Sequence, residues 1–216
     1  MNGDLIVFDL DGVLIDSRLA NYEAFRYGLL AAGCPEPEPT TVAALIGLPP
    51  VTMFERLGCP SHCSQAFYDS HVQPHYVDNL DSFARPYPQA RQVLETLKGL
   101  GYRLAACTSG DEKTQHRVLT SIGLRDLLEV LHTPCRSAFR KPDPRYLAEV
   151  VDHFQPQGRV LHVEDTEIGL QMGRAFGAVT FFASYGYGTH GEVTPDHRLE
   201  QLTDLVELVG ANAALC

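Results

Sequence analysis

The chain opens with a run of four apolar residues, Leu5–Phe8, that ends abruptly at the sequence Asp9-Leu10-Asp11-Gly12. A short uninterrupted apolar run is typical of a strand that is buried on both faces, as in the middle of a parallel sheet. Asp9 then lies at the carboxyl end of the strand, which is the edge where open α/β sheets bind ligands.

From residue 86 onward, helical and extended patterns alternate, which predicts βαβ units and a parallel sheet. Gly101, Gly123 and Gly177 stand where three helices would end, and Ser109 and Glu112 have capping-box spacing. The expected helices are 88–100, 110–122, 144–153, 167–176 and 199–209, and the expected strands are 102–107, 128–132, 159–163 and 178–182.

Residues 17 to about 84 break this alternation, because their apolar positions recur at helical spacing only. Ser17 is the expected N-cap of the first helix, and further helices are expected at 40–46, 50–58 and 62–79. The predicted fold class is α/β: a doubly wound (Rossmann-like) parallel sheet core with an inserted all-helical cap domain. Residues 1–16 and 85–216 form the core in this prediction, and residues 17–84 form the cap, with hinges near 16–17 and 83–86.

Composition narrows the possible partners. Of the 216 residues 44% are hydrophobic and 20% charged, which is typical of a globular chain. The net charge is −10 and there are only three lysines, Lys98, Lys113 and Lys141, so we expect no binding to nucleic acid or to an anionic membrane. No signal-peptide pattern and no apolar run of about 20 residues is present, so we expect a cytoplasmic protein, as a monomer or weak homodimer.

The residues that follow the predicted strands carry the candidate chemistry. In a doubly wound sheet they converge on one edge, and two acids at one strand end need a hard divalent cation such as Mg²⁺. Each of these residues also has an ordinary structural interpretation, since Asp and Gly dominate turns and acids begin helices favourably. Together they supply what phosphoryl transfer requires, namely a nucleophile, a cation and a proton donor. The residues of this set are Asp9, Asp11, Thr108, Ser109, Lys141, Glu164 and Asp165.

Four short motifs make the chain resemble the haloacid dehalogenase (HAD) superfamily, in the branch of phosphoglycolate phosphatase and beta-phosphoglucomutase. The motifs cover nearly the whole chain in order and fall at the ends of the expected strands. They are Asp9-Leu10-Asp11-Gly12-Val13, Cys107-Thr108-Ser109, Lys141-Pro142-Asp143-Pro144 and Val163-Glu164-Asp165-Thr166 with Gly169.

The resemblance implies a role for each motif residue. Asp9 would attack phosphorus and become an aspartyl phosphate, and Asp11 would act as general acid and base. Thr108 and Lys141 would also be catalytic, and they would bind the phosphoryl group together with Ser109 and Gly110. Mg²⁺ would be held by a ligand set that comprises Asp9, Asp11, Asp165 and Glu164.

The resemblance leaves three activities open. A magnesium-dependent phosphatase of small phosphate monoesters, phosphoglycolate-like or sugar phosphates, is favoured. A phosphomutase commonly has a cation on the cap loop, where this chain has Leu48. A catalytically silent magnesium-binding module is the third possibility, although no motif is broken.

The predicted cap offers few groups for a substrate. Arg18 and Arg56 are the candidates to bind a small phosphorylated metabolite with at most one extra carboxylate. The loop 185–188 is either a rim of the site or a surface loop. A cluster with zinc-ligand residue types also occurs in the cap, although packed thiols and surface histidines are the favoured interpretation: Cys59, His62, Cys63, His71 and His75.

Overall fold

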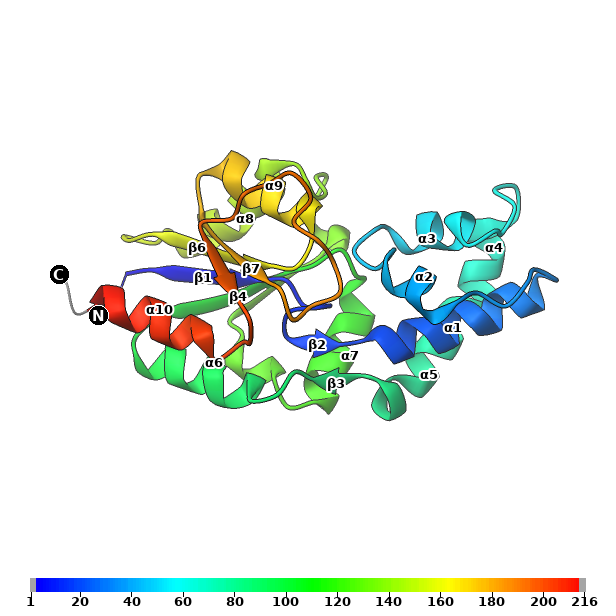
Figure 1. The fold of residues 1–216 in the computed structure, drawn as a ribbon, viewed down its shortest axis with the longest axis horizontal. Helices are drawn as coiled ribbons and strands as arrows, with labels where there is room; N and C mark the ends of the chain where they lie inside the picture. Colours follow the sequence, from blue (N-terminus) through cyan, green and yellow to red (C-terminus); the bar gives the residue numbers. More distant parts are fainter. Residues whose placement is uncertain (1–2, 214–216) are drawn as a thin grey trace.

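A computed structural model describes residues 3–213, apart from the side chains at positions 81 and 211–213, and shows an α/β part joined to an all-helical part (Figure 1). Six parallel strands form the sheet. Their order is β5 (Val130–His132), β4 (Arg103–Cys107), β1 (Leu5–Phe8), β6 (Val160–Glu164), β7 (Val179–Ala183) and β8 (His197–Leu199). The predicted doubly wound parallel sheet is confirmed.

Helices cover both faces of the sheet (Figure 1). One face packs against α6 (Ala90–Gly99), α7 (Glu112–Ser121) and α10 (Asp204–Ala213), and the other against α8 (Pro144–Phe154) and α9 (Glu167–Phe176). The strand β1 feeds both cores, since Ile6 and Phe8 belong to the first and Leu5 and Val7 to the second. This explains why its sequence is a continuous apolar run rather than an alternating one.

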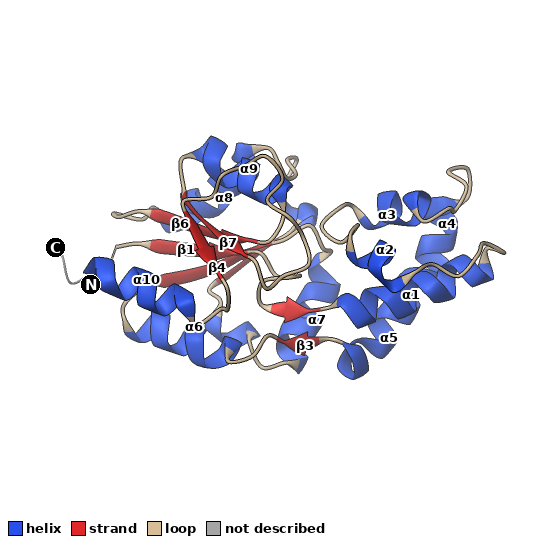
Figure 2. Cartoon of the chain, in the orientation of Figure 1, coloured by secondary structure: helices blue, strands red, loops and turns tan. Residues whose placement is uncertain are grey.

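The helical region consists of α1 (Arg18–Ala31), α2 (Pro39–Ala43), α3 (Pro50–Arg56), α4 (Ser64–Phe67), a π-helical turn (Tyr68–Val72) and α5 (Gln73–Phe83), as Figure 2 shows. It has an apolar cluster of its own, around Phe25, Leu29 and Phe54. A two-stranded antiparallel ribbon, β2 (Ile15–Asp16) with β3 (Arg85–Pro86), ties together the two connections to the sheet. Strands of two residues leave no hydrophobic pattern, so the sequence did not predict this ribbon.

Several local predictions were wrong. The N-cap of α7 is Asp111, whose carboxylate accepts a hydrogen bond from the Thr114 amide at 3.0 Å, so Ser109 is left outside the helix. The hydroxyl of Ser17 does not cap α1, because it donates to the Asp11 carboxylate instead. The segment expected to be helical at 199–209 begins as the end of β8 and becomes helical only at Asp204.

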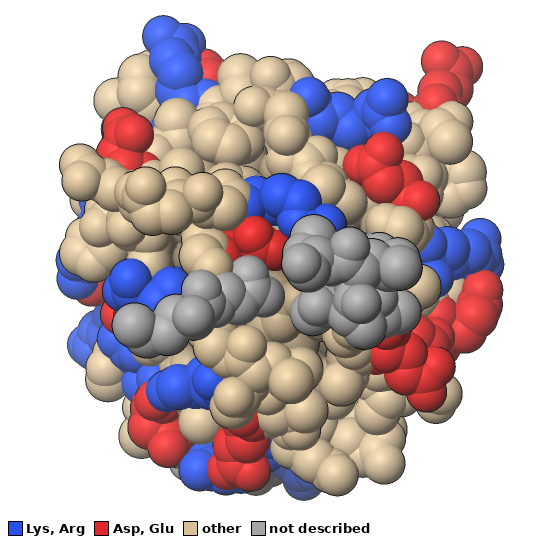
Figure 3. Space-filling model, turned by 90° about the vertical axis from the view of Figure 1, so that its left-hand side faces the viewer, with Lys and Arg blue, Asp and Glu red and all other residues tan. Residues whose placement is uncertain are grey.

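The surface shows no dominant charge on the face opposite the helical region. Basic and acidic side chains are intermixed over the described part of this face (Figure 3). None of the described helices is both long and apolar enough to cross a membrane.

A histidine is enclosed in the sheet where β6 packs against α9. The side chain of His162 is fully buried, and neither ring nitrogen has a hydrogen-bond partner among the described residues. A Cβ atom at Gly173 of α9 would lie 2.7 Å from Nδ1, so the helix packs closely against the ring. Burial, helped by the charge of Lys141, lowers the pKa of His162 to about 3.

We therefore expect His162 to make the protein less stable in mild acid. In the unfolded chain His162 takes up a proton near its ordinary pKa of about 6.5, whereas in the folded chain its ring stays neutral down to about pH 3. The free energy of unfolding therefore decreases as the pH is lowered through this window. Between pH 7 and pH 5 the contribution is roughly 2 kcal/mol. In urea unfolding, the decrease in unfolding free energy from pH 7 to pH 5 should be about 2 kcal/mol smaller for His162→Gln than for the native chain. An identical loss in both proteins would contradict the assignment.

Candidate active site

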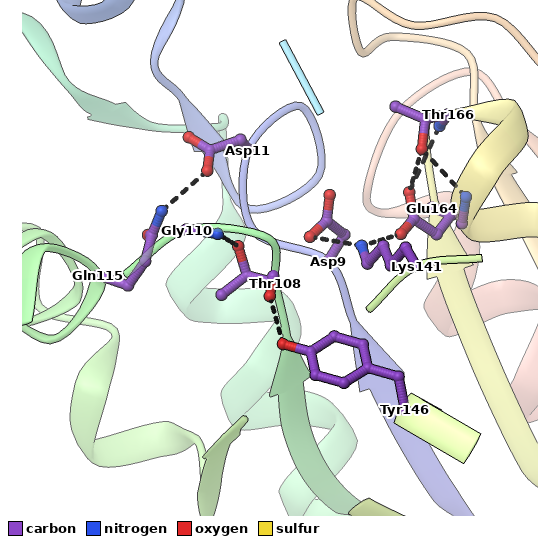
Figure 4. A network of polar contacts seen from close by, with 10 residues as sticks. Asp9, Asp11, Thr108, Gly110, Gln115, Lys141, Tyr146, Glu164 and Thr166 are labelled. Atoms are coloured by element: carbon purple, nitrogen blue, oxygen red, sulfur yellow. Dashed lines mark hydrogen bonds and ion pairs between the residues drawn. The ribbon is translucent and has the colours of Figure 1, made fainter. Parts of the chain in front are cut away.

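The site lies at the carboxyl ends of three adjacent strands, β4, β1 and β6. Asp9 follows β1, Thr108 follows β4 and Glu164 ends β6, so the strand order brings these predicted residues together (Figure 4). Asp165 follows directly after β6. Lys141 joins them from the loop between β5 and α8. The four motifs, which span more than 150 residues of sequence, therefore meet at one edge of the sheet.

Lys141 links two buried carboxylates. Its Nζ atom lies 2.9 Å from Oδ1 of Asp9 and also contacts Oε1 of Glu164 (Figure 4). Burial and the nearby charge of Glu164 raise the pKa of Asp9 to about 7, although Lys141 opposes the shift. Burial alone would lower the pKa of Lys141, but the charges of Asp9 and Glu164 outweigh it and hold that pKa well above its usual value. The lysine therefore stays cationic.

Asp165 is held in a narrow cradle of backbone. Its Oδ2 atom accepts hydrogen bonds from the amides of Tyr187 and Gly188, each at 3.1 Å. A Cβ atom at Gly12 would lie 2.0 Å from the same oxygen, so only glycine fits there. Loop 185–188 therefore borders the site, as one of its two sequence interpretations predicts, and is not merely a surface loop.

The acidic group is suited to a metal ion. Asp9, Glu164 and Asp165 each offer an oxygen within 4.8 Å of the others, and all three are buried. Oδ1 of Asp165 has no hydrogen-bond partner among the described residues. Burial and the charges of Glu164 and Asp9 raise the pKa of Asp165 well above its usual range. Three buried carboxylates with a single lysine between them are short of positive charge, which a divalent cation would supply.

Glu164 already has partners for both oxygens. Oε1 contacts Lys141, and Oε2 accepts from the Thr166 hydroxyl at 3.0 Å. Gly169 leaves the space that this carboxylate occupies, since a Cβ atom there would lie 2.0 Å from Oε1. Here Glu164 orients Lys141, and its role as a metal ligand stays a prediction.

Asp11 has a separate hydrogen-bond network that sequence reasoning missed. Ser17 donates to its Oδ1 atom, and Nε2 of Gln115 donates to Oδ2 at 3.0 Å. The Tyr187 hydroxyl lies 2.9 Å from the Ser17 hydroxyl. Burial and the charge of Asp9 raise the pKa of Asp11 to about 6, against the lowering effect of these hydrogen bonds.

The position of Gln115 in the sequence indicates a buried polar residue, a feature from which its role at Asp11 could be predicted. It is 3% exposed and lies one turn before Val118 and Leu119, so it is a polar residue on the buried face of α7. A glutamine at such a position needs a polar partner. A Cβ atom at Gly110 would lie 2.3 Å from Nε2 of Gln115, so Gly110 gives this amide its path to Asp11.

Thr108 is held by hydrogen bonds to both its backbone and its side chain. Its carbonyl oxygen accepts from the Tyr146 hydroxyl at 2.7 Å, and its Oγ1 atom accepts from the Gly110 amide at 3.1 Å. Thr108, Ser109 and Gly110 line the same pocket as Asp9. They therefore present hydroxyl and amide groups beside the predicted nucleophile.

The two arginines predicted to contact substrate are elsewhere. Arg18 pairs with Asp16 at 2.5 Å, and its guanidinium lies 5.7 Å from the centre of the Tyr187 ring. Arg56 is exposed near the end of α3. Neither lines the pocket that contains Asp9, so this structure does not bring them to the site and their contact with substrate stays a prediction.

The cysteines and histidines of the helical region do not gather as ligands. Among the described residues, the acidic group at Asp9 is the one set of three ligand-type side chains within 4.8 Å. His71 lies 2.8 Å from the Ser70 hydroxyl through Nδ1, and His75 stacks on Tyr27 with ring centres 4.4 Å apart. Cys59 is buried and Cys63 is half-buried, and no described geometry supports zinc at this cluster, including His62.

Comparison with known proteins agrees with the geometry. A model of the family described as haloacid dehalogenase-like hydrolase matches residues 6–183. The chain belongs to this family. It is 28% identical over 210 residues to the phosphoglycolate phosphatase of Aquifex aeolicus, and the aligned region covers 95% of this chain and 96% of that protein.

Other similarities extend over most of the chain. The tyrosine-protein kinase PtkA of Mycobacterium tuberculosis is 27% identical over 85% of this chain and 63% of its own length. The crystal structure of a predicted phosphoglycolate phosphatase from Haemophilus somnus matches with a TM-score of 0.88, at 22% identity, over 97% of this chain and 99% of that one. The resemblance inferred from the four motifs is confirmed.

The cradle around Asp165 gives a prediction with a matched control. Gly12 and Gly33 both have positive φ, +86° and +72°, but a Cβ atom at Gly33 meets nothing within 4 Å. We expect Gly33→Ala to cost about 1–2 kcal/mol of unfolding free energy, from backbone conformation alone. Gly12→Ala should cost at least about 1 kcal/mol more, because it displaces a buried, hydrogen-bonded carboxylate. Equal losses in chemical unfolding would show that Asp165 is not held as described.

Proposed function

We propose that this hydrolase is a magnesium-dependent phosphatase that cleaves small phosphate monoesters through a phosphorylated Asp9. The observation that supports it is the pairing of two differently held carboxylates. Asp9 is fixed by Lys141, whereas Asp11 two residues later is hydrogen-bonded by Ser17 and Gln115. The first arrangement suits a nucleophile, and the second suits a group that exchanges a proton near neutral pH.

The proposed reaction has two steps. In the first, an Asp9 oxygen bonds to phosphorus, the ester P–O bond breaks, and Asp11 gives its proton to the leaving alcohol. In the second, the oxygen of a water molecule bonds to the phosphorus and the bond between phosphorus and the Asp9 oxygen breaks. Asp11 takes the proton of the water, the Asp9 carboxylate is restored, and inorganic phosphate leaves. Thr108, Ser109 and Gly110 would hydrogen-bond the phosphoryl oxygens, and Lys141 would balance the charge at Asp9.

Magnesium fits the acidic group, because Asp9 and Asp165 offer carboxylate oxygens within 4.8 Å of each other and Oδ1 of Asp165 has no hydrogen-bond partner among the described residues. The carboxylates of Asp9 and Asp165 and the backbone carbonyl of Asp11 would hold the ion, with Glu164 as a further ligand. Bound Mg²⁺ would neutralise negative charge on the transferring phosphoryl group. The proposal also includes a small phosphorylated metabolite as partner, rather than nucleic acid or a membrane, and a cytoplasmic location.

The acceptor of the phosphoryl group separates this proposal from its alternatives. A phosphatase passes the group to water, whereas a phosphomutase or a kinase passes it to another hydroxyl. A silent module would bind magnesium and transfer nothing. Release of inorganic phosphate into solution is therefore the result that favours the phosphatase over all three.

Replacement of Asp9 tests the nucleophile. We expect Asp9→Asn to abolish magnesium-dependent phosphate release from small monoesters, because the amide cannot form the phosphoryl intermediate. Asp78→Asn, an exposed aspartate on α5, serves as the control and should keep native turnover. Substantial turnover by a folded Asp9→Asn protein would refute the role given to Asp9.

Replacement of Asp11 tests the general acid. We expect Asp11→Asn to lower kcat/KM for alkyl phosphates by at least about 10²-fold, because an alkoxide leaves poorly without a proton. The loss should be much smaller for 4-nitrophenyl phosphate, whose leaving group needs little protonation. An equal loss for both esters would point to a structural effect of the substitution instead.

A further inference from the structure

The pocket in front of Asp9 has two unlike sides. The sheet edge and the start of α7 contribute polar groups such as Asp9, Thr108 and Gln115. The helical region closes the pocket with a largely apolar wall. Three aromatic rings belong to this wall, and Leu48 lies beside them in the loop before α3. The wall residues are Phe25, Ile46, Leu48, Pro50, Met53, Tyr68, Val72 and Tyr76.

The charges that line this pocket are all negative. Asp9, Asp11 and Asp111 are its ionisable acids, and no lysine or arginine lines it among the described residues. Lys141 is buried behind Asp9, where it is engaged by two carboxylates. The neutral hydrogen-bonding groups on the wall side are the amides of Asn21 and Gln73 and the hydroxyls of Tyr68 and Tyr76.

None of the three arginines of the helical region lines the pocket. Arg18 is paired with Asp16, and Arg26 with Glu36 at 2.7 Å. Arg56 is exposed on α3 and does not line the pocket.

These features set the chemistry of the leaving group. A carboxylate on the departing alcohol would lose its hydration against apolar side chains, near Asp111 and with no lysine or arginine in the described lining to pair with it. An uncharged body with apolar or aromatic surface loses little hydration and gains contact with the rings. The phosphate itself is provided for at the sheet edge, so the restriction applies to the alcohol alone.

We propose that the substrate is the phosphate monoester of an uncharged alcohol with an apolar or aromatic body, and that the pocket discriminates against alcohols carrying a carboxylate, such as glycolate. This rests on the proposed phosphatase function and narrows it. It separates this chain's substrate from the one that gives its phosphoglycolate phosphatase relatives their name.

Two matched substrate pairs test the proposal on the full chain with Mg²⁺. Benzyl phosphate is compared with 4-carboxybenzyl phosphate, which differs by one added carboxylate. The phosphate ester of glycolamide is compared with phosphoglycolate, which differs in charge at nearly constant size. We expect kcat/KM to be at least tenfold higher for the neutral member of each pair. The highest value should belong to benzyl phosphate.

Arginine substitutions test the physical cause. Leu48→Arg places a cation on the wall, and Leu48→Gln is its neutral control; Gln73→Arg with Gln73→Met repeats the comparison at a second, half-buried position. We expect each arginine variant to narrow the neutral-to-acid ratio of kcat/KM by about tenfold, while the controls leave it near the native ratio. Because ratios are compared within one protein, a general loss of activity does not alter the result.

The outcomes separate this inference from the function on which it rests. If phosphoglycolate equals or exceeds its neutral partner, or if both arginine variants leave the ratio unchanged, the inference is overturned while the phosphatase stands. If the folded native chain hydrolyses none of the four esters, the proposed function fails and takes the inference with it. A preference for the neutral esters that the arginine variants narrow and the control variants keep supports both.

Discussion

The mutual repulsion of buried carboxylates at the end of β1 and β6 governs the rest of this structure. Asp9, Glu164 and Asp165 are buried together where water cannot screen them, half-buried Asp11 adds its charge nearby, and Lys141 is paired with Asp9 and Glu164. Such an arrangement persists only if each oxygen is held by a donor or a cation. The glycines of the site, the loop at 185–188 and the hydrogen bonds to Asp11 all serve that requirement.

The two parts of the chain divide the chemistry between them. The sheet edge carries the charged and hydrogen-bonding groups, which suit a phosphoryl group of any ester. The helical region adds a wall with no cation among its described lining residues, and in the proposed function this wall would face the alcohol to which the phosphate is attached. In this account, reaction type is a property of the sheet and substrate choice is a property of the wall. The family resemblance thus informs the first more than the second.

Local patterns predicted what depends on local physics. The apolar run before Asp9 and the alternation after residue 86 identified the sheet, and the strand ends identified the residues that meet there. The partner of an individual side chain was not predictable: the spacing predicts Ser17 as a helix cap and the charge of Arg18 suggests a substrate contact, yet the Ser17 hydroxyl donates to Asp11 and Arg18 pairs with Asp16. Gln115 escaped notice because its partner lies 104 residues away in sequence.

The central claim is that Asp9 itself carries the phosphoryl group. The direct measurement is acid quenching of the native chain during turnover with benzyl phosphate and Mg²⁺, followed by borohydride reduction and peptide mass spectrometry. The account predicts that Asp9 is reduced to homoserine, as an acyl phosphate would be, and that other carboxylates in the same sample are not. Continued turnover with Asp9 unmodified, or with the reduction product at another residue, would contradict it.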